Sequence, residues 1–156
     1  MSLIHKTGNL IDLAEAGQFN VIVQGCNCHN TMGSGIAKEI RERYPQAYET
    51  DCKTTAGDYL KLGNFTVGWA EQFAIVNAYT QFSFNRNGSN TDLFEYTAFA
   101  LILQKLGYMF PGCNFGFPYI GCGLAGGDES VIISLLEKFA DNIEKTGGTV
   151  TLVKFK

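Results

Sequence analysis

Basic residues are scarce in this sequence. Its 156 residues include 12 lysines and arginines against 15 aspartates and glutamates, which gives a net charge of -3. A protein that holds nucleic acid through its phosphates needs a basic face, so this balance argues against nucleic acid as a partner. Long apolar runs are also missing: none approaches the ~20 residues that cross a membrane, and the N-terminus has no signal-peptide core. We therefore expect a cytoplasmic protein without a membrane partner.

A complete disulfide framework is excluded, because the sequence has five cysteines. We expect reduced thiols, in keeping with a cytoplasmic location. Cys26, Cys28 and His29 lie close together and could be taken for three metal ligands. A zinc site normally adds a fourth ligand and a second clustered pair, whereas the other three cysteines are isolated in the sequence. We predict that the protein uses neither a metal nor a cofactor.

The sequence has the length and composition of one globular domain. It is 46% apolar and 17% charged, which suits a protein with a single hydrophobic core. No linker, repeat or low-complexity stretch divides it, so we predict one domain over residues 1–156. Glycine is frequent, with 18 residues. Many occur in pairs or as Gly-x-Gly, where backbone turns sharply or approaches a ligand closely.

Apolar patterning predicts strands that alternate with helices. A helix is expected over residues 34–48, kinked or ended in its first part by Pro45. A second should run from an N-cap at Thr91 or Asp92 to residue 106 and stop at Gly107, after a loop at 85–90. A third should span 129–145 and close at the glycine pair 147–148. The expected strands are 21–23, 64–70, 73–78, 114–119 and 149–155, with a hairpin turn at 71–72.

This alternation predicts an α/β protein whose mixed, largely parallel sheet carries helices on both faces. Ligands of such sheets usually bind at the carboxyl ends of the strands, where two loops here are rich in glycine. The first, residues 25–36, contains Gly33-Ser34-Gly35 and opens a helix, a context that presents backbone N–H groups to a phosphate. It lacks the P-loop and dinucleotide fingerprints, so alone it is equally consistent with a tight turn.

The second loop, residues 120–128, also joins a strand to a helix, and Asp128 is placed to cap that helix. Two such loops on one sheet suit a diphosphate better than a single phosphate. The segments QGCNCHNTMGSGIAKEIRERYPQAY and FPYIGCGLAGGD resemble the macrodomain family. The likeness is greatest to the yeast-type ADP-ribose 1″-phosphate phosphatases and the terminal ADP-ribose glycohydrolase-like proteins. It covers nearly the whole chain and implies a three-layer α/β/α fold.

The resemblance also implies a set of ligand-binding residues. Asn9 takes the place of an Asp that accepts from the adenine amine in many macrodomains, and Asn27 matches the Asn that binds the distal ribose. Phe155 falls where the family often stacks an aromatic ring on adenine, although a core or edge role is equally consistent with its position. Loop residues from both sides would wrap the diphosphate. The full set is Asn9, Leu10, Asn27, Gly33, Ser34, Gly35, Ile36, Ile120, Gly121, Cys122, Gly123, Leu124, Ala125 and Phe155.

Hydrolysis at the distal ribose would need a positioned water and a group that exchanges a proton. The candidates are Asn27, His29 and Asp128. An exposed loop position for His29 and a capping role for Asp128 are the structural alternatives. The sequence departs from its relatives at Gln24, where the phosphatases have a His, and at Ala125, where the glycohydrolase-like branch has an Asp.

Two classes of function therefore stay open. As an enzyme, the protein would release phosphate from ADP-ribose 1″-phosphate, or ADP-ribose from a modified macromolecule. As a binding module, it would only hold ADP-ribose. The aromatic residues within 77–85 could stack bases of single-stranded nucleic acid or line the rim of a nucleotide pocket, and the acidic composition favours the rim.

Overall fold

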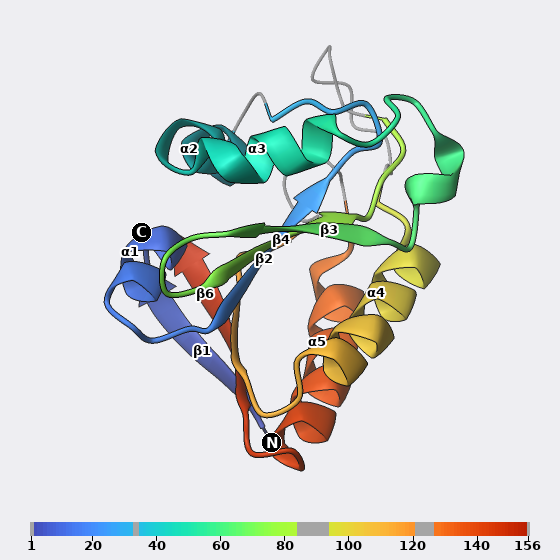
Figure 1. Ribbon diagram of the computed structural model, residues 1–156. Coiled ribbons are helices and arrows are strands. Elements are labelled where there is room, and N and C mark those ends of the chain that lie inside the picture. Colours follow the sequence, from blue (N-terminus) through green and yellow to red (C-terminus); the bar gives the residue numbers. More distant parts are fainter. Residues whose placement is uncertain (1, 33–34, 84–93, 121–126, 156) are drawn as a thin grey trace.

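The computed structural model describes residues 2–32, 35–83, 94–120 and 127–155. Its strands are β1 (Leu3–Gly8), β2 (Val21–Cys26), β3 (Phe65–Trp69), β4 (Ala74–Tyr79), β5 (Asn114–Phe117) and β6 (Thr149–Phe155). They form one sheet in the order β1-β6-β5-β2-β4-β3 (Figure 1). Neighbours are parallel except for β3 and β4, which form an antiparallel hairpin. The predicted mixed, largely parallel sheet is confirmed.

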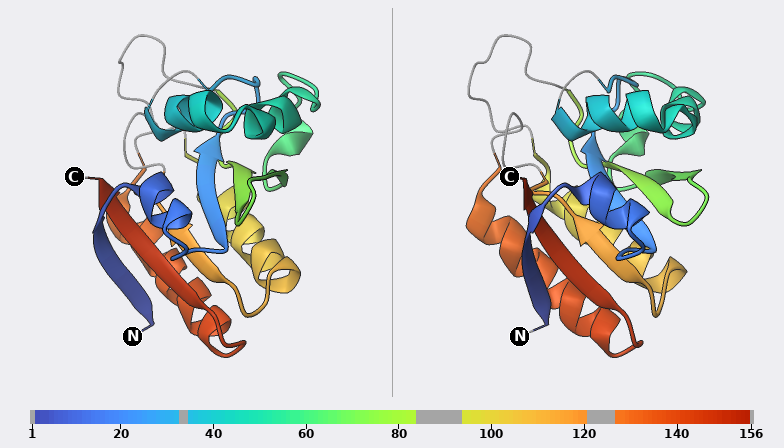
Figure 2. Two further views of the ribbon diagram at one scale, coloured as in Figure 1. Left: turned by 60° about the vertical axis from the view of Figure 1, so that its left-hand side comes forward. Right: turned by 90° about the vertical axis from the view of Figure 1, so that its left-hand side faces the viewer.

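Helices cover both faces of the sheet, as expected. They are α1 (Leu10–Glu15), α2 (Gly35–Arg43), α3 (Pro45–Cys52), α4 (Tyr96–Met109), α5 (Glu129–Glu144) and a short 3-10 helix, η1 (Tyr59–Lys61). One layer holds α1, α2 and α3, and the other holds α4 and α5 (Figures 1 and 2). The result is the three-layer α/β/α arrangement.

Successive residues of the central strands feed two separate cores. In β2, Val21 and Val23 pack toward α4 and α5, whereas Ile22 packs among residues of α1, α2 and α3. Because β2 lies inside the sheet and both of its faces are covered, its first three residues form a continuous apolar run rather than an alternating pattern. That run explains why the short β-branched segment at 21–23 identified the strand.

Three details differ from the sequence prediction. Pro45 begins a separate helix, α3, because the residue before a proline is driven out of helical backbone, and Tyr44 has φ -134 and ψ 70 there. Helix α4 begins after Glu95, later than Thr91 or Asp92, and continues through Gly107. That glycine faces α5, where an added Cβ would lie 3.6 Å from the Phe139 ring. The loop predicted at 85–90 lies outside the described residues.

Candidate functional site

A pocket of about 560 Å³ lies where the ends of β1 and β6 meet the starts of α1, α2 and α5. That volume falls in the range of small-molecule sites. The carboxyl ends of the parallel strands β1 and β6 form one wall, in the position expected for ligands of such sheets. The described residues that line the pocket are Gly8, Asn9, Leu10, Gly35, Ile36, Glu39, Pro118, Tyr119, Glu129, Val153, Lys154 and Phe155.

Five of the predicted ligand-binding residues therefore come together in one cavity: Asn9, Leu10, Gly35, Ile36 and Phe155. Phe155 keeps 76% of its surface exposed, which is unusual for a phenylalanine. An aromatic face left in solvent at the rim of a pocket is available for stacking. Gly35 has φ +59 at the first residue of α2, a backbone conformation that favours glycine.

Asn9 is the N-cap of α1. Its Oδ1 accepts a hydrogen bond from the backbone N–H of Asp12 at 2.9 Å, which satisfies one of the free donors at the helix start. Its position in the lining keeps the side chain beside the pocket. The role in adenine binding that the resemblance implies for Asn9 stays a prediction.

An ion-pair cluster fixes α1 against α2 beside the pocket. Arg43 contacts the carboxylates of Asp12 at 3.2 Å, Glu15 at 2.6 Å and Glu39 at 2.8 Å. Tyr44 donates its hydroxyl to Glu15, and this bond, with Arg43, holds the pKa of Glu15 below its usual value. Burial and the Glu15 carboxylate raise the pKa of Tyr44 to about 12. The cluster sets the spacing of the two helices that line the pocket.

Asn27 lies on the loop that follows β2, and only 8% of its surface is exposed. Its Oδ1 accepts from the backbone N–H of His29 at 2.8 Å, and its Nδ2 donates to Thr31 at 2.7 Å. The His29 ring meets Phe82 edge-on at 4.8 Å, and Phe82 in turn stacks on Tyr59 at 4.5 Å. His29 is therefore packed against aromatic rings in a half-buried position, and it is not among the described residues that line the pocket.

A buried lysine holds this loop in shape. The Lys61 ammonium donates to the carbonyls of Cys28 at 3.0 Å and Thr55 at 3.1 Å, and to Oδ1 of Asn30 at 2.6 Å. Asn30 adopts φ +60, which this bond and its own bond to the Thr54 carbonyl help to fix. No motif in the sequence drew attention to Lys61, because its partners lie 6 to 33 residues away along the chain.

Lys61 also contacts a group of polar side chains between the sheet and α3. Its ammonium lies 4.9 Å from the centre of the Tyr79 ring, and the Tyr79 hydroxyl donates to Asp51 at 2.6 Å. Asp51 is fully buried, and this burial raises its carboxyl pKa, although Tyr79 and Lys61 act in the opposite direction. Burial and the Asp51 carboxylate also raise the pKa of Tyr79.

Gln24, at the position where the resemblance implies a histidine in the phosphatases, has a structural role. It is fully buried and donates its amide to Asn77 at 2.8 Å, tying β2 to β4. Asn77 in turn donates to the Ala47 carbonyl at 3.0 Å and to the Thr66 hydroxyl at 3.0 Å. The position is thus part of the polar contact between the sheet and α3.

Asp128 caps α5, as its position in the second glycine loop suggested. One carboxylate oxygen accepts from the backbone N–H of Ser130 at 2.9 Å and from its hydroxyl at 2.8 Å. These bonds hold the pKa of Asp128 below its usual value, so it is a carboxylate at neutral pH. In that form it could accept a proton or orient a water, but it could not act as a general acid.

The remaining predicted residues fall into two groups. Ile120 is buried after β5, and a side chain at Gly25 would come within 2.9 Å of it. The others lie outside the described residues, so their placement stays a prediction: Gly33, Ser34, Gly121, Cys122, Gly123, Leu124 and Ala125. Sequence reasoning missed Glu39, Tyr119, Glu129 and Lys154, which line the pocket.

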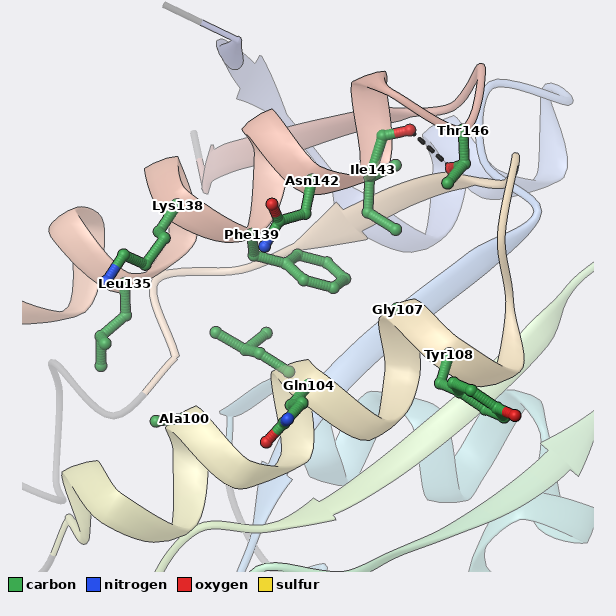
Figure 3. Close-up of a pocket in the computed structure, with 11 residues that line it drawn as sticks. Ala100, Gln104, Gly107, Tyr108, Leu135, Lys138, Phe139, Asn142, Ile143 and Thr146 are labelled. Carbon is green, nitrogen blue, oxygen red and sulfur yellow. Dashed lines mark hydrogen bonds between the residues drawn. The ribbon is translucent and has the colours of Figure 1, made fainter.

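A second cavity of about 500 Å³ lies between α4 and α5, on the other side of the sheet (Figure 3). Phe139 and Leu103 supply apolar surface, and Gln104, Lys138 and Asn142 supply polar groups. It contains none of the predicted site residues.

In the described ranges, no group of three or more His, Cys, Asp or Glu side chains is placed to hold a metal ion. Nor is any described helix long and apolar enough to cross a membrane.

Comparison with known proteins identifies one relative by sequence and several solved structures by fold. No family model matches the sequence. The chain is 31% identical over 153 residues to an uncharacterized 17.5 kDa protein from the tk-vs intergenic region of Enterobacteria phage T4, covering 88% of this chain and 89% of that protein.

Solved structures share the fold at lower identity. The macrodomain of Mycobacterium tuberculosis DarG matches with a TM-score of 0.73 at 21% identity, covering 97% of this chain and 96% of that one. Thermosipho africanus DarTG in complex with ADP-ribose matches with a TM-score of 0.64 at 16% identity, over 89% of this chain and 38% of that one. The chain therefore belongs to the family of the phage T4 17.5 kDa protein, and its fold is that of the macrodomains.

Proposed function

We propose that this protein binds ADP-ribose or a close derivative in the pocket between α1, α2 and the end of β6. The observation that carries the proposal is the convergence of Asn9, Leu10, Gly35, Ile36 and Phe155 in one cavity of about 560 Å³. Those residues come from three segments that are distant in the sequence. The ADP-ribose complex of Thermosipho africanus DarTG, which shares the fold, supports the same ligand class.

The pocket also has the chemical character that a nucleotide requires. Leu10, Ile36 and Val153 give it an apolar wall, and Phe155 offers an exposed ring. The start of α2 at Gly35 directs helix N–H groups toward the same space, where they favour an anion. A base would pack on the apolar side and a diphosphate would lie toward the helix start.

Replacement of Phe155 by alanine is expected to weaken ADP-ribose binding by about 5- to 100-fold, because stacking on an aromatic ring contributes roughly 1–3 kcal/mol per base. Thermal stability should change little, since the ring is 76% exposed. Calorimetric titration with ADP-ribose measures the effect. Trp69→Ala is the matched control: this ring is 64% exposed on β3, at the opposite edge of the sheet. Equal losses in the two variants would contradict a specific role for Phe155.

We further propose that the protein hydrolyses ADP-ribose 1″-phosphate to ADP-ribose and phosphate, with the chemistry at Asn27, His29 and Asp128. Asn27 would hold the distal ribose, and water would attack the phosphorus while giving a proton to the Asp128 carboxylate. The bond between phosphorus and the 1″-oxygen would break, and that oxygen would take a proton from His29 or from water. The lowered pKa of Asp128 keeps it ionised at neutral pH and opposes a role as an acid, and it also makes the carboxylate a weaker base. An ADP-ribosyl hydrolase acting on modified macromolecules, and a module that only binds, are the two alternatives.

The test is release of inorganic phosphate from ADP-ribose 1″-phosphate by the purified protein. Asn27→Ala should abolish the release, because its amide holds both the loop and the predicted ribose site.

Asp128→Asn separates the two roles of Asp128. Its amide oxygen can still cap α5, so stability should be kept while turnover falls if the carboxylate is the base. Unchanged turnover in Asp128→Asn would leave Asp128 as a cap only. Tight ADP-ribose binding without phosphate release would favour the binding module.

A further inference from the structure

We infer that Glu39 makes the pocket selective for adenine over a 6-oxo purine, by accepting a hydrogen bond from the exocyclic amine of the base. This inference rests on the proposed function, because it identifies the residue that would read the base of the bound nucleotide. It assigns to Glu39 a role that the sequence analysis did not suggest.

Glu39 is held in one position at the pocket wall. It lies one helical turn after Ile36, so both side chains leave the same face of α2 and both line the cavity. One carboxylate oxygen, Oε2, accepts from Arg43 at 2.8 Å. Because Arg43 is also bound to Asp12 and Glu15 of α1, the carboxylate cannot swing freely into solvent. Its Oε1 remains on a side chain that is 35% exposed beside the cavity.

Asn9 does not supply this acceptor by itself. Its Oδ1 already accepts from the backbone of Asp12, so the amide Nδ2 is the group that Asn9 can offer a ligand most readily. The two residues therefore present a charged acceptor and a neutral donor in the same cavity. The edge of adenine carries a matching amine donor next to ring-nitrogen acceptors, whereas a 6-oxo purine places a carbonyl oxygen where the amine would be.

The charges of the lining orient the ligand in the same sense. Three charged side chains line the described part of the pocket, and two of them, Glu39 and Glu129, are carboxylates; Lys154 is the third. A carboxylate repels a phosphate but attracts an amine. The base, and not the diphosphate, should therefore lie against Glu39, with Phe155 available to stack on it.

The experiment compares calorimetric titrations with ADP-ribose and with inosine diphosphate ribose, which differ in the base alone. The wild-type protein should prefer ADP-ribose by about tenfold or more, the usual discrimination of a well-placed hydrogen bond to a base edge. Glu39→Ala should reduce that preference to less than about threefold, mainly because the variant binds ADP-ribose more weakly. Glu39→Gln should also raise the affinity for the inosine ligand, because the amide can donate to the 6-oxygen.

Glu42→Gln is the matched control, since Glu42 is an exposed carboxylate on the same helix and does not line the pocket. It should keep the wild-type preference. Equal affinity of the wild-type protein for both ligands would overturn the inference and leave the proposed function intact. A preference that survives in Glu39→Ala would also overturn it. Absence of ADP-ribose binding in the wild-type protein would instead overturn the proposed function.

Discussion

Replacement of Lys61 by methionine is expected to lower the free energy of unfolding by about 3–5 kcal/mol, the usual cost of removing one partner from a buried charged network. The methionine fits the space but donates no hydrogen bond. It would remove one donor each from the carbonyls of Cys28 and Thr55 and from the side-chain oxygen of Asn30. The Cys28 carbonyl would keep its bond from the backbone N–H of Gly57, and Asn30 Oδ1 would keep its bond from the Thr54 hydroxyl. Urea denaturation at neutral pH, followed by circular dichroism, measures the loss.

The same variant should show a distinct dependence on pH. In the folded protein, the pKa of Asp51 is raised by burial and lowered by Lys61, so loss of the lysine raises it further. An acid whose folded pKa exceeds its unfolded pKa favours the folded state below the unfolded value, and this contribution fades as the pH rises through the folded value. The difference in the free energy of unfolding between Lys61→Met and the wild type should therefore decrease as the pH falls from 7 toward the usual pKa range of an Asp.

Lys105→Met is the control for this prediction. Lys105 also donates to a backbone carbonyl and an asparagine side chain, those of Gly63 and Asn64, but it is only half-buried. Water can replace its bonds, so its loss should cost less than about 1 kcal/mol. Similar losses for the two lysines, or a gap that does not change with pH, would contradict the role assigned to Lys61.

Two glycine-to-alanine substitutions are expected to act in opposite directions. Gly148 lies between α5 and β6, where an added Cβ would come within 2.1 Å of the Cys113 carbonyl oxygen and 2.8 Å of Ile143. Backbone cannot retreat as a flexible side chain can, so Gly148→Ala should cost about 3 kcal/mol, at the upper end for overpacking. Thermal denaturation of the purified variant measures the loss.

Gly107→Ala should instead be neutral or stabilise the protein by up to ~1 kcal/mol, because alanine is the better helix former. Its Cβ would make an ordinary contact, 3.6 Å from the Phe139 ring. A destabilised Gly107→Ala would mean that α4 and α5 pack more closely than the structure shows. An unaffected Gly148→Ala would mean that the turn before β6 can move.

Much of the fold follows from patterns that a sequence displays directly. Strands β2, β4, β5 and β6 each contain a largely buried stretch rich in apolar residues. Asp128 marks the start of α5 because a side chain that caps a helix must precede it. Strand β1 escaped notice because Leu3 is its only buried residue, so no apolar run marks it. Helix α1 spans six residues, which is too short for helical periodicity to stand out.

The residues of the site likewise include some that the sequence predicted and some that it did not. Family resemblance located Asn9, Leu10, Gly35, Ile36 and Phe155, and the fold brings them to one cavity. Glu39 could not be found, because a glutamate among the charges of α2 has the pattern of a solvated helix face. Its importance arises from Arg43, whose other partners lie 28 and 31 residues away. Contacts of that separation depend on tertiary structure and leave no local signal.

The pairing of β1 with β6 has a consequence for the order of folding. Leu3 lies opposite Val150, and Gly8 lies opposite Phe155, so one wall of the pocket joins residues nearly 150 positions apart. Closing so long a loop is slow and comes late relative to local helices and hairpins. During synthesis, the β3–β4 hairpin and α4 can form well before the pocket exists. The binding site should therefore be among the last parts of the molecule to mature, and hydrogen exchange during refolding should protect the β1 amides after those of β4.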